Sequence, residues 1–244
     1  VLFRSPIGRF VTEEIKKAGL DYLIIQVDES RNTTLAFVTL KDGERDFAFY
    51  RHDTADYNVD LKEIDFSSFK NLKIVDLGSL MLSEKNGEKL ARSITKAAKK
   101  AGAKLSFDMN FRMDVYDDFE SAKKAYKPYV EVADIIKFSD DELVAYTGIE
   151  DFDKAVEKIY RKDLLLVVTL GSRGSYYRYN DLFGTVATEK VKPVDTTGAG
   201  DAFFGTFLAN IENVEPTKEN IEKAMKEANK KGAEATQFYG ALKL

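Results

Sequence analysis

Residues 195–201, Asp-Thr-Thr-Gly-Ala-Gly-Asp, combine small residues with carboxylates directly before a predicted helix. Gly198, Ala199 and Gly200 allow the backbone to turn tightly and to approach a ligand. A turn that leads into a helix presents free amide groups and the positive end of the helix dipole, which suits a phosphate. Asp201 would then lie in the first helical turn, where a carboxylate can accept a proton from an attacking hydroxyl. The segment therefore predicts phosphoryl transfer, although an acidic residue in a first turn also serves as a simple helix cap.

The composition of the 244 residues leaves carboxylates, backbone amides, Arg and Lys as the chemical groups. Cysteine is absent, which excludes disulfides, thiolate metal sites and a cysteine nucleophile. His52 is the single histidine, which argues against multi-histidine metal sites and a Ser-His-Asp triad. The net charge of −4, from 37 basic and 41 acidic residues, argues against nucleic-acid binding. No apolar run approaches the ~18 residues of a membrane span and no signal peptide is visible, so we expect no membrane contact and a cytoplasmic location.

Alternating strand and helix patterns from residue 72 onwards predict an α/β fold with a mainly parallel sheet flanked by helices. The expected strands are 72–78, 103–110, 134–139 and 164–170. The expected helices are 83–101, 118–133, 140–146, 153–161 and 202–209, with a kink or break at Pro128. Residues 33–51 instead predict two strands joined at Asp42-Gly43, a strong hairpin signal. We therefore expect a small β lid over residues 30–56 or so.

The Asp-Thr-Thr-Gly-Ala-Gly-Asp string resembles the signature of the ribokinase-like (PfkB) carbohydrate kinases. Further segments resemble motifs of that family and follow in its order. Gly8-Arg9-Phe10 resembles its Phe-Gly-x-Phe segment, and residues 107–112 resemble its Asp-Pro-Asn-x-Arg segment, with Met109 replacing proline. Residues 137–142 resemble its Asn-x-x-Glu motif, with Ser139 replacing asparagine, and residues 168–174 resemble its nucleotide-side strand and turn. Together they cover residues 6–241. The resemblance implies one ribokinase-like kinase domain with a small β lid.

The resemblance also implies roles for individual residues, with ATP, Mg2+ and K+ as cofactors. Asp201 would be the catalytic base that deprotonates the sugar hydroxyl, and the amides of residues 198–200 would form the anion hole. The nucleotide would contact Asn110, Thr169, Gly171 and Gly174. Glu142 would position the magnesium and its water shell, mostly indirectly, while Asp195 and Thr197 would help to bind a monovalent cation. Phosphoryl transfer mainly requires positioning and charge neutralisation, which such residues supply.

Each of these auxiliary positions has an ordinary structural interpretation as well. Ser139-x-x-Glu142 is a good helix capping box, and Glu142 can cap a helix and still face the metal shell. Asn110 follows a predicted strand, where polar residues often only start a loop. Gly171 and Gly174 are also typical turn glycines.

Residues 49–56, Phe-Tyr-Arg-His-Asp-Thr-Ala-Asp, resemble a stretch of the bacterial fructokinases within the family. The resemblance implies a kinase that converts fructose to fructose 6-phosphate, with Arg51 on the substrate side. Arg51 could equally serve an acidic sugar, so a 2-keto-3-deoxygluconate kinase or another PfkB sugar kinase stays open, as does a non-catalytic relative. The expected partners are the sugar and ATP, and the β lid in this family often pairs two subunits, which favours a homodimer.

The chain begins Val1-Leu2-Phe3-Arg4-Ser5, without methionine. These five residues match the in-frame translation of a common sequencing adapter, so we expect residues 1–5 to be a non-native scar. The family normally has a further N-terminal part, which holds the first strand and a segment that grips sugar hydroxyls. We therefore expect the 244-residue chain to be inactive or a poor kinase by itself.

Overall fold

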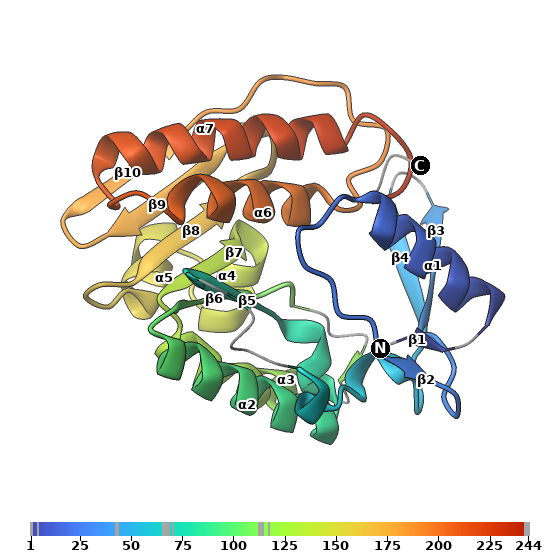
Figure 1. The fold of residues 1–244 in the computed structure, drawn as a ribbon. Helices are drawn as coiled ribbons and strands as arrows, with labels where there is room; N and C mark the ends of the chain where they lie inside the picture. Colours follow the sequence, from blue (N-terminus) through green and yellow to red (C-terminus); the bar gives the residue numbers. More distant parts are fainter. Residues whose placement is uncertain are drawn as a thin grey trace. The chain divides into compact units, whose positions relative to one another are not determined.

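The computed structural model describes residues 2–3, 5–41, 44–64, 69, 71–111, 115–116 and 118–241. It divides into two compact units (Figure 1). The first unit comprises Val1–Asn71, Leu80–Ala97 and Arg112–Ala125, and the second comprises Leu72–Ser79, Ala98–Phe111 and Tyr126–Leu244. The predicted Asp42-Gly43 turn and Arg112 of the Asp-x-Asn-x-Arg segment lie outside the described residues.

The second unit is built on a six-stranded sheet with the strand order β10-β9-β8-β7-β6-β5. The strands are β5 (Ile74–Gly78), β6 (Lys104–Asp108), β7 (Ile135–Ser139), β8 (Leu165–Thr169), β9 (Ser175–Tyr179) and β10 (Leu182–Val186). Strands β5 to β8 run parallel, and β9 and β10 continue the sheet antiparallel. The predicted α/β fold with a mainly parallel sheet is confirmed. The carboxyl ends of the parallel strands meet at one edge, where sites usually form in such sheets.

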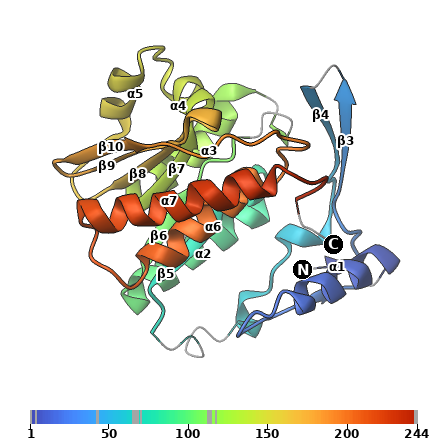
Figure 2. The same cartoon turned by 90° about the horizontal axis from the view of Figure 1, so that it is seen from above.

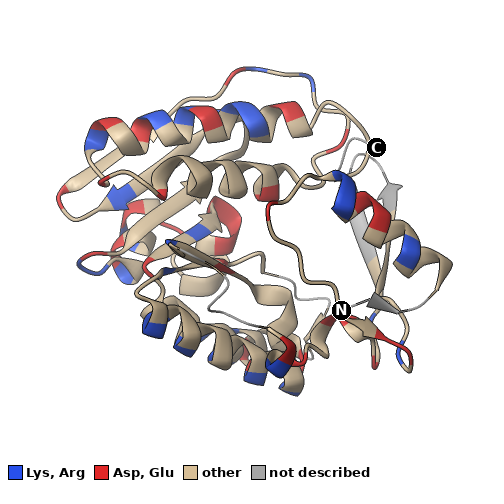
Figure 3. Ribbon diagram, viewed as in Figure 1, with Lys and Arg blue, Asp and Glu red and all other residues tan. Residues whose placement is uncertain are grey.

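Helices α6 (Ala199–Ile211) and α7 (Lys218–Ala235) lie side by side in both views (Figures 1 and 2). Phe203 and Phe207 of α6 share a buried core with Ile135, Val167 and Tyr177 of the sheet. Figure 3 shows α7 banded with charges of both signs, while α6 is almost uncharged. The buried residues of α6 are Phe203, Phe204, Phe207 and Ile211, and they pack in one core with residues of the sheet and of α7.

The opposite face of the sheet packs against aromatic side chains of α3 (Phe119–Val132) and α4 (Asp140–Thr147). The ring of Phe107 lies 5.8 Å from that of Tyr126, and Phe138 lies 5.9 Å from Tyr146, measured between centroids. The remaining helices that contribute to the second unit are α2 (Lys85–Ala101), shared with the first unit, and α5 (Phe152–Ile159), with the 3-10 turn η6 (Gly171–Arg173). The prediction at Pro128 was a kink or a break, and the break is wrong because α3 continues through Pro128.

The first unit contains α1 (Pro6–Lys17). Ser5 caps the N-terminus of this helix, because its hydroxyl oxygen accepts the Gly8 amide at 3.1 Å. Its strands are β1 (Leu2–Phe3), which pairs in parallel with β2 (Val27–Asp28), and β3 (Leu35–Lys41), which pairs antiparallel with β4 (Glu44–Tyr50). Short 3-10 turns are η1 (Ala55–Tyr57), η2 (Leu61–Glu63) and η4 (Ser79–Ser83), the last at a boundary between the units. The β3–β4 hairpin confirms the two strands predicted for residues 33–51.

Within the described ranges, no helix combines the length and the apolar character that crossing a membrane requires.

Candidate active site

Helix α6 begins at Ala199, three residues before the predicted start at residue 202, so Ala199 and Gly200 belong to its first turn. Gly198 is the N-cap residue and adopts the left-handed conformation, with φ of 78°. A Cβ there would lie 2.9 Å from the Cα of Ala241, so this position also lets the C-terminal segment approach. The amide of Ala199 donates to the Thr196 carbonyl at 3.2 Å. The amides of the next residues in the first turn, Gly200 and Asp201, are the ones for which an α-helix offers no intrahelical acceptor.

Asp201 lies in the first turn of α6, as the sequence predicts, and its residue is exposed. Its charge acts on three ionisable groups of the neighbouring strand ends, Asp76, Asp108 and Lys137. The carboxylate therefore lies near the carboxyl edge of the parallel strands.

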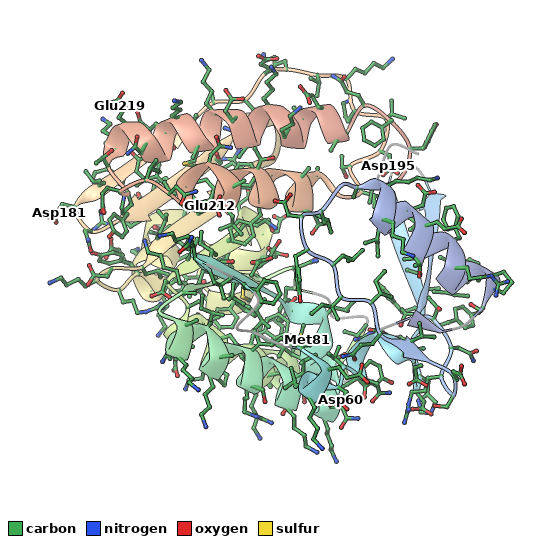
Figure 4. The ribbon with its side chains drawn as sticks, in the orientation of Figure 1. Asp60, Met81, Asp181, Asp195, Glu212 and Glu219 are labelled. Carbon is green, nitrogen blue, oxygen red and sulfur yellow. The ribbon has the colours of Figure 1, made fainter. Side chains whose placement is uncertain are left out.

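Asp195, labelled in Figure 4, organises the loop that leads into α6. Its Oδ1 accepts both the amide of Thr197 at 2.9 Å and the Thr197 hydroxyl at 2.7 Å. Its Oδ2 accepts the amide of Gly240 at 2.9 Å, and the amides of Val194 and Asp195 donate to the Thr236 carbonyl. Asp195 and Thr197 thus join two loops, at residues 194–198 and 236–241. Among the residues that the structure describes, no group of three or more His, Cys, Asp and Glu side chains could hold a metal ion.

Lys137 and Asp108 form a buried ion pair that sequence reasoning missed. The Lys137 ammonium donates to Asp108 Oδ1 at 2.8 Å, and their side chains are 7% and 10% exposed. Burial raises the pKa of Asp108 to about 6, against the opposing effect of Lys137, and the charges of Glu142 and Asp201 add to the rise. Burial alone would lower the pKa of Lys137, but the surrounding carboxylates outweigh it and raise that pKa.

Asp76 adds a third carboxyl group to these strand ends. Ser106, on the adjacent strand, donates its hydroxyl to Asp76 Oδ1 at 2.5 Å. Burial raises the pKa of Asp76, and the charge of Asp201 contributes to the rise. The carboxyl edge of the sheet is thus rich in acidic groups around a single buried ammonium, that of Lys137, among the side chains described there.

Glu142 forms the capping box that the sequence predicts at the start of α4. Its Oε2 accepts the Ser139 amide at 2.7 Å, and Ser139 Oγ accepts the Glu142 amide at 3.2 Å. Its Oε1 also accepts the amide of Phe111 at 2.8 Å, so the carboxylate ties the loop after β6 to the end of β7. Asn110, in that loop, has φ of 30° and accepts the Ser79 hydroxyl at its carbonyl. Glu142 therefore links the predicted metal-side and nucleotide-side segments through backbone contacts.

A cavity of about 630 Å³ lies beside the N-terminal turn of α6. Its lining includes three residues predicted to contact a nucleotide, Thr169, Gly171 and Gly174, together with Ala199 and Gly200 of the predicted anion hole. The structure thus brings these five positions to one cavity. Asn110, Glu142 and Asp201 are not part of its lining.

Gly174 is also a structural requirement. Its φ is 97°, and a Cβ would lie 2.1 Å from the carbonyl oxygen of Val186. Gly171 has φ of 58° with open space around its Cα. The turn-glycine interpretation therefore holds for both, and Gly174 in addition permits the backbone after β10 to form the cavity wall.

Arg51, predicted on the substrate side, is buried in the first unit and held by several groups. Its Nε and Nη2 donate to Asp56 Oδ2 at 3.0 and 2.9 Å, its Nη1 donates to the Ser83 hydroxyl, and its guanidinium lies 5.1 Å from the ring centroid of Tyr57. Asp56 also accepts the hydroxyls of Thr34 and Thr54. These hydroxyls and Arg51 lower the pKa of Asp56, although burial opposes the shift.

A second cavity, of about 760 Å³, lies within the first unit. Arg51 and Thr54 line it, together with Asn32, Tyr50 and Ser83. The Arg51 guanidinium is therefore paired with an aspartate, although Arg51 is a lining residue of this cavity.

Comparison with known proteins places the chain in a family. The pfkB family carbohydrate kinase profile matches residues 4–243. "Fructokinase-1" of Zea mays is 37% identical over 242 residues, which cover 96% of this chain and 75% of the maize protein. "Probable fructokinase-7" of Arabidopsis thaliana is 37% identical over 226 residues, which cover 91% of this chain and 66% of that protein, so the chain spans just under two thirds of its length.

Among solved structures, the fructokinase of Vibrio cholerae O395 in a fructose-, ADP- and calcium-bound form superposes with a TM-score of 0.86. It is 29% identical, and the match covers 98% of this chain and 79% of that one. The predicted ribokinase-like fold and family are thereby confirmed. The chain belongs to the pfkB family of carbohydrate kinases.

Proposed function

We propose that the chain carries the ATP- and phosphoryl-binding machinery of a fructokinase, which transfers the γ-phosphate of ATP to fructose and forms fructose 6-phosphate. The observation that carries this proposal is the glycine turn at the N-terminus of α6, with Asp201 in the first turn and the 630 Å³ cavity beside it. Helix N-terminal amides and a neighbouring carboxylate are what acceptor deprotonation and phosphoryl stabilisation need. The fructokinase relatives and the sugar and nucleotide named for the Vibrio structure support the choice of substrates.

In this proposal, the nucleotide lies in the cavity against the backbone of Gly171 and Gly174. The space beside the Cα of Gly171 is open, whereas the absence of a Cβ at Gly174 admits the backbone of Val186, which shapes the wall. The amides of the first turn of α6 face the transferring phosphoryl group. Asp201 accepts the proton of the attacking sugar hydroxyl. The contribution of the chain is therefore positioning and charge stabilisation, which dominate catalysis of phosphoryl transfer.

The donor groups present fit the two cations that the family resemblance implies. Both Glu142 oxygens already accept backbone amides and keep further lone pairs, which suits a contact with Mg2+ through water. Asp195 and Thr197 supply oxygen atoms in a loop that suits K+. Such cations, when bound, would neutralise phosphate charge. Glu142 holds the loop at residues 110–111, and Asp195 holds the loop at residues 194–198.

The first unit favours a neutral sugar over an acidic one. Because Asp56 pairs with Arg51, the 760 Å³ cavity offers no unpaired guanidinium to a sugar carboxylate. Fructose fits this charge balance better than 2-keto-3-deoxygluconate does. The second sugar remains the alternative substrate that a direct comparison must test.

The experiment is a coupled assay of ADP release over a panel of sugars that includes fructose, ribose and 2-keto-3-deoxygluconate. It uses this chain and an extended chain in which the N-terminal segment of the maize relative precedes residue 6. We expect fructose to stimulate ADP release most strongly in the extended chain. Absence of stimulation by every sugar in both proteins would contradict the proposed function, and a higher kcat/KM for 2-keto-3-deoxygluconate would contradict the proposed substrate.

We also propose that the β3–β4 hairpin pairs two copies of the chain. Phe37 and Tyr50 lie on this two-stranded sheet with 55% and 66% of their surface exposed. A two-stranded hairpin that exposes aromatic side chains gains stability by covering them. Analytical ultracentrifugation of the wild type and of Phe37→Ser tests this: we expect a dimer that dissociates in the variant, and a wild-type monomer at all concentrations would contradict it.

A further inference from the structure

Lys137 is a buried cation to which the proposed mechanism assigns no role. It lies in β7, two residues before the carboxyl end of that strand, directly opposite Asp108 of β6 and Val167 of β8. Side chains alternate between the faces of a strand, so Lys137 shares a face with Ile135, which packs against α6. The Lys137 ammonium is therefore directed to the α6 side of the sheet, at the end where α6 begins.

An ammonium in this place requires compensation. Moving a charge out of water is costly, and here the carboxylate of Asp108, together with the charges of Glu142 and Asp201, compensates that cost. Asp108 supplies one hydrogen bond, whereas an ammonium has three donors. The pairing with Asp108 thus explains how Lys137 is tolerated, but stability does not require the pair, because well-packed apolar residues often replace a buried ion pair without loss.

The contact of Lys137 with Gly200 gives the ammonium a position relative to the anion hole. A Cβ built on Gly200 would lie 3.1 Å from Lys137 Nζ, and no atom of Asp108 lies within 4 Å of that point. The ammonium is therefore the nearer of the two charges to the first turn of α6. Gly200 also lines the proposed nucleotide cavity, so this one residue borders both the cavity and the Lys137 ammonium.

A cation beside a helix N-terminus is unfavourable by itself, because the helix dipole already carries positive charge there. The arrangement becomes favourable when an anion of high charge binds to the same turn. We propose that Lys137 is a positioning residue for the terminal phosphoryl group, supplying the positive charge behind Gly200 that holds this group at the N-terminus of α6. This inference rests on the proposed kinase function and adds a residue outside the glycine-rich signature.

The test compares the binding of two probes, ADP and the non-hydrolysable β,γ-imido analogue of ATP, to the 244-residue chain by isothermal titration calorimetry. The described residues that line the cavity all belong to the second unit, so binding is measured on the chain as it stands. In Lys137→Met we expect affinity for the ATP analogue to fall about tenfold while affinity for ADP changes less than about twofold, the size expected for loss of one charged contact. Lys104→Met, at the exposed start of β6, is the matched control and should change neither affinity.

The double variant Lys137→Met, Asp108→Asn separates this role from simple pairing, because it leaves no uncompensated buried charge. We expect it to recover the thermal stability that Lys137→Met loses, yet to keep the selective loss of affinity for the ATP analogue. Recovery of wild-type affinity for both probes in the double variant would show that Lys137 only neutralises Asp108, and would overturn the inference. A wild type that binds neither probe would overturn the proposed function and this inference together, whereas ADP and analogue binding that falls equally in Lys137→Met would overturn the inference alone.

Discussion

Lys137 and Asp108 face each other across β7 and β6, and their ion pair of 2.8 Å fixes two strand ends beneath the first turn of α6. The two residues come together because a parallel sheet brings the carboxyl ends of adjacent strands to one edge. The backbone of β6 continues into the loop of Asn110 and Phe111, which Glu142 holds from α4. The Lys137–Asp108 pair thus joins β6 to β7 beside Gly200, and Glu142 joins the loop after β6 to the start of α4.

The raised pKa of Asp108 predicts a pH dependence of stability. The folded value is about 6 and the ordinary value is 3.8, so the folded protein binds this proton more tightly than the unfolded chain does. The free energy of unfolding contributed by Asp108 therefore falls as pH rises from about 4 to about 6. We expect urea unfolding to show the wild type gaining about 1 kcal/mol relative to Asp108→Asn when the pH drops from 7 to 5. A relative loss at pH 5 would instead mean that Lys137 holds the pKa of Asp108 below its ordinary value.

Gly174 and Gly171 form a matched pair for a test of the cavity wall. Gly174→Ala must move the backbone at Val186, because the new Cβ would lie 2.1 Å from its carbonyl oxygen. We expect a loss of about 2–5 kcal/mol of unfolding free energy together with weakened nucleotide binding. Gly171→Ala meets open space and carries only the cost of a positive φ, about 1 kcal/mol. Equal losses in chemical denaturation would show that contact with Val186 does not shape this wall.

Asp56 is expected to set the preference for a neutral sugar through Arg51. In Asp56→Asn the guanidinium loses its carboxylate partner and becomes available to a sugar carboxylate. We expect the ratio of kcat/KM for fructose to that for 2-keto-3-deoxygluconate to fall about tenfold in the extended chain.

Asp53→Asn is the control for this experiment, because Asp53 lies in the same segment but pairs with Arg31 and is largely exposed. Its sugar preference should equal that of the wild type. If Asp56→Asn leaves the ratio of the two kcat/KM values unchanged, the Arg51–Asp56 pair does not set the choice of sugar.

The sequence predicted the central strands and the helices between them because their signals are local. The run Leu164–Val168 is continuously apolar and forms most of β8. Gly148 ends α4 in the left-handed conformation that glycine favours at a helix end. Helix α7 and the β9–β10 hairpin were not predicted. In α7 the apolar face, with Ile221, Ala224, Met225 and Ala228, is masked by many charged residues, although its spacing is helical.

Within the candidate site, the sequence predicted the residues that a continuous motif contains and missed those that only pairing brings together. Asp201 and the 198–200 turn lie in one string, and the structure places them at one helix N-terminus. Lys137 looks like an interruption of an apolar strand until the register sets it opposite Asp108. The Arg51–Asp56 pair likewise depends on a local turn whose geometry the sequence pattern does not fix.

The most direct test of the proposed function is the fructose-dependent ADP release of Asp201→Asn, measured in the extended chain beside the wild type. Removing a general base should lower turnover by about 10²–10⁴-fold. Affinity for ADP, measured by calorimetry, should stay within about twofold of the wild type, because Asp201 does not line the nucleotide cavity. Turnover close to the wild-type value, with fructose 6-phosphate as the product, would contradict the assignment of Asp201 as the base.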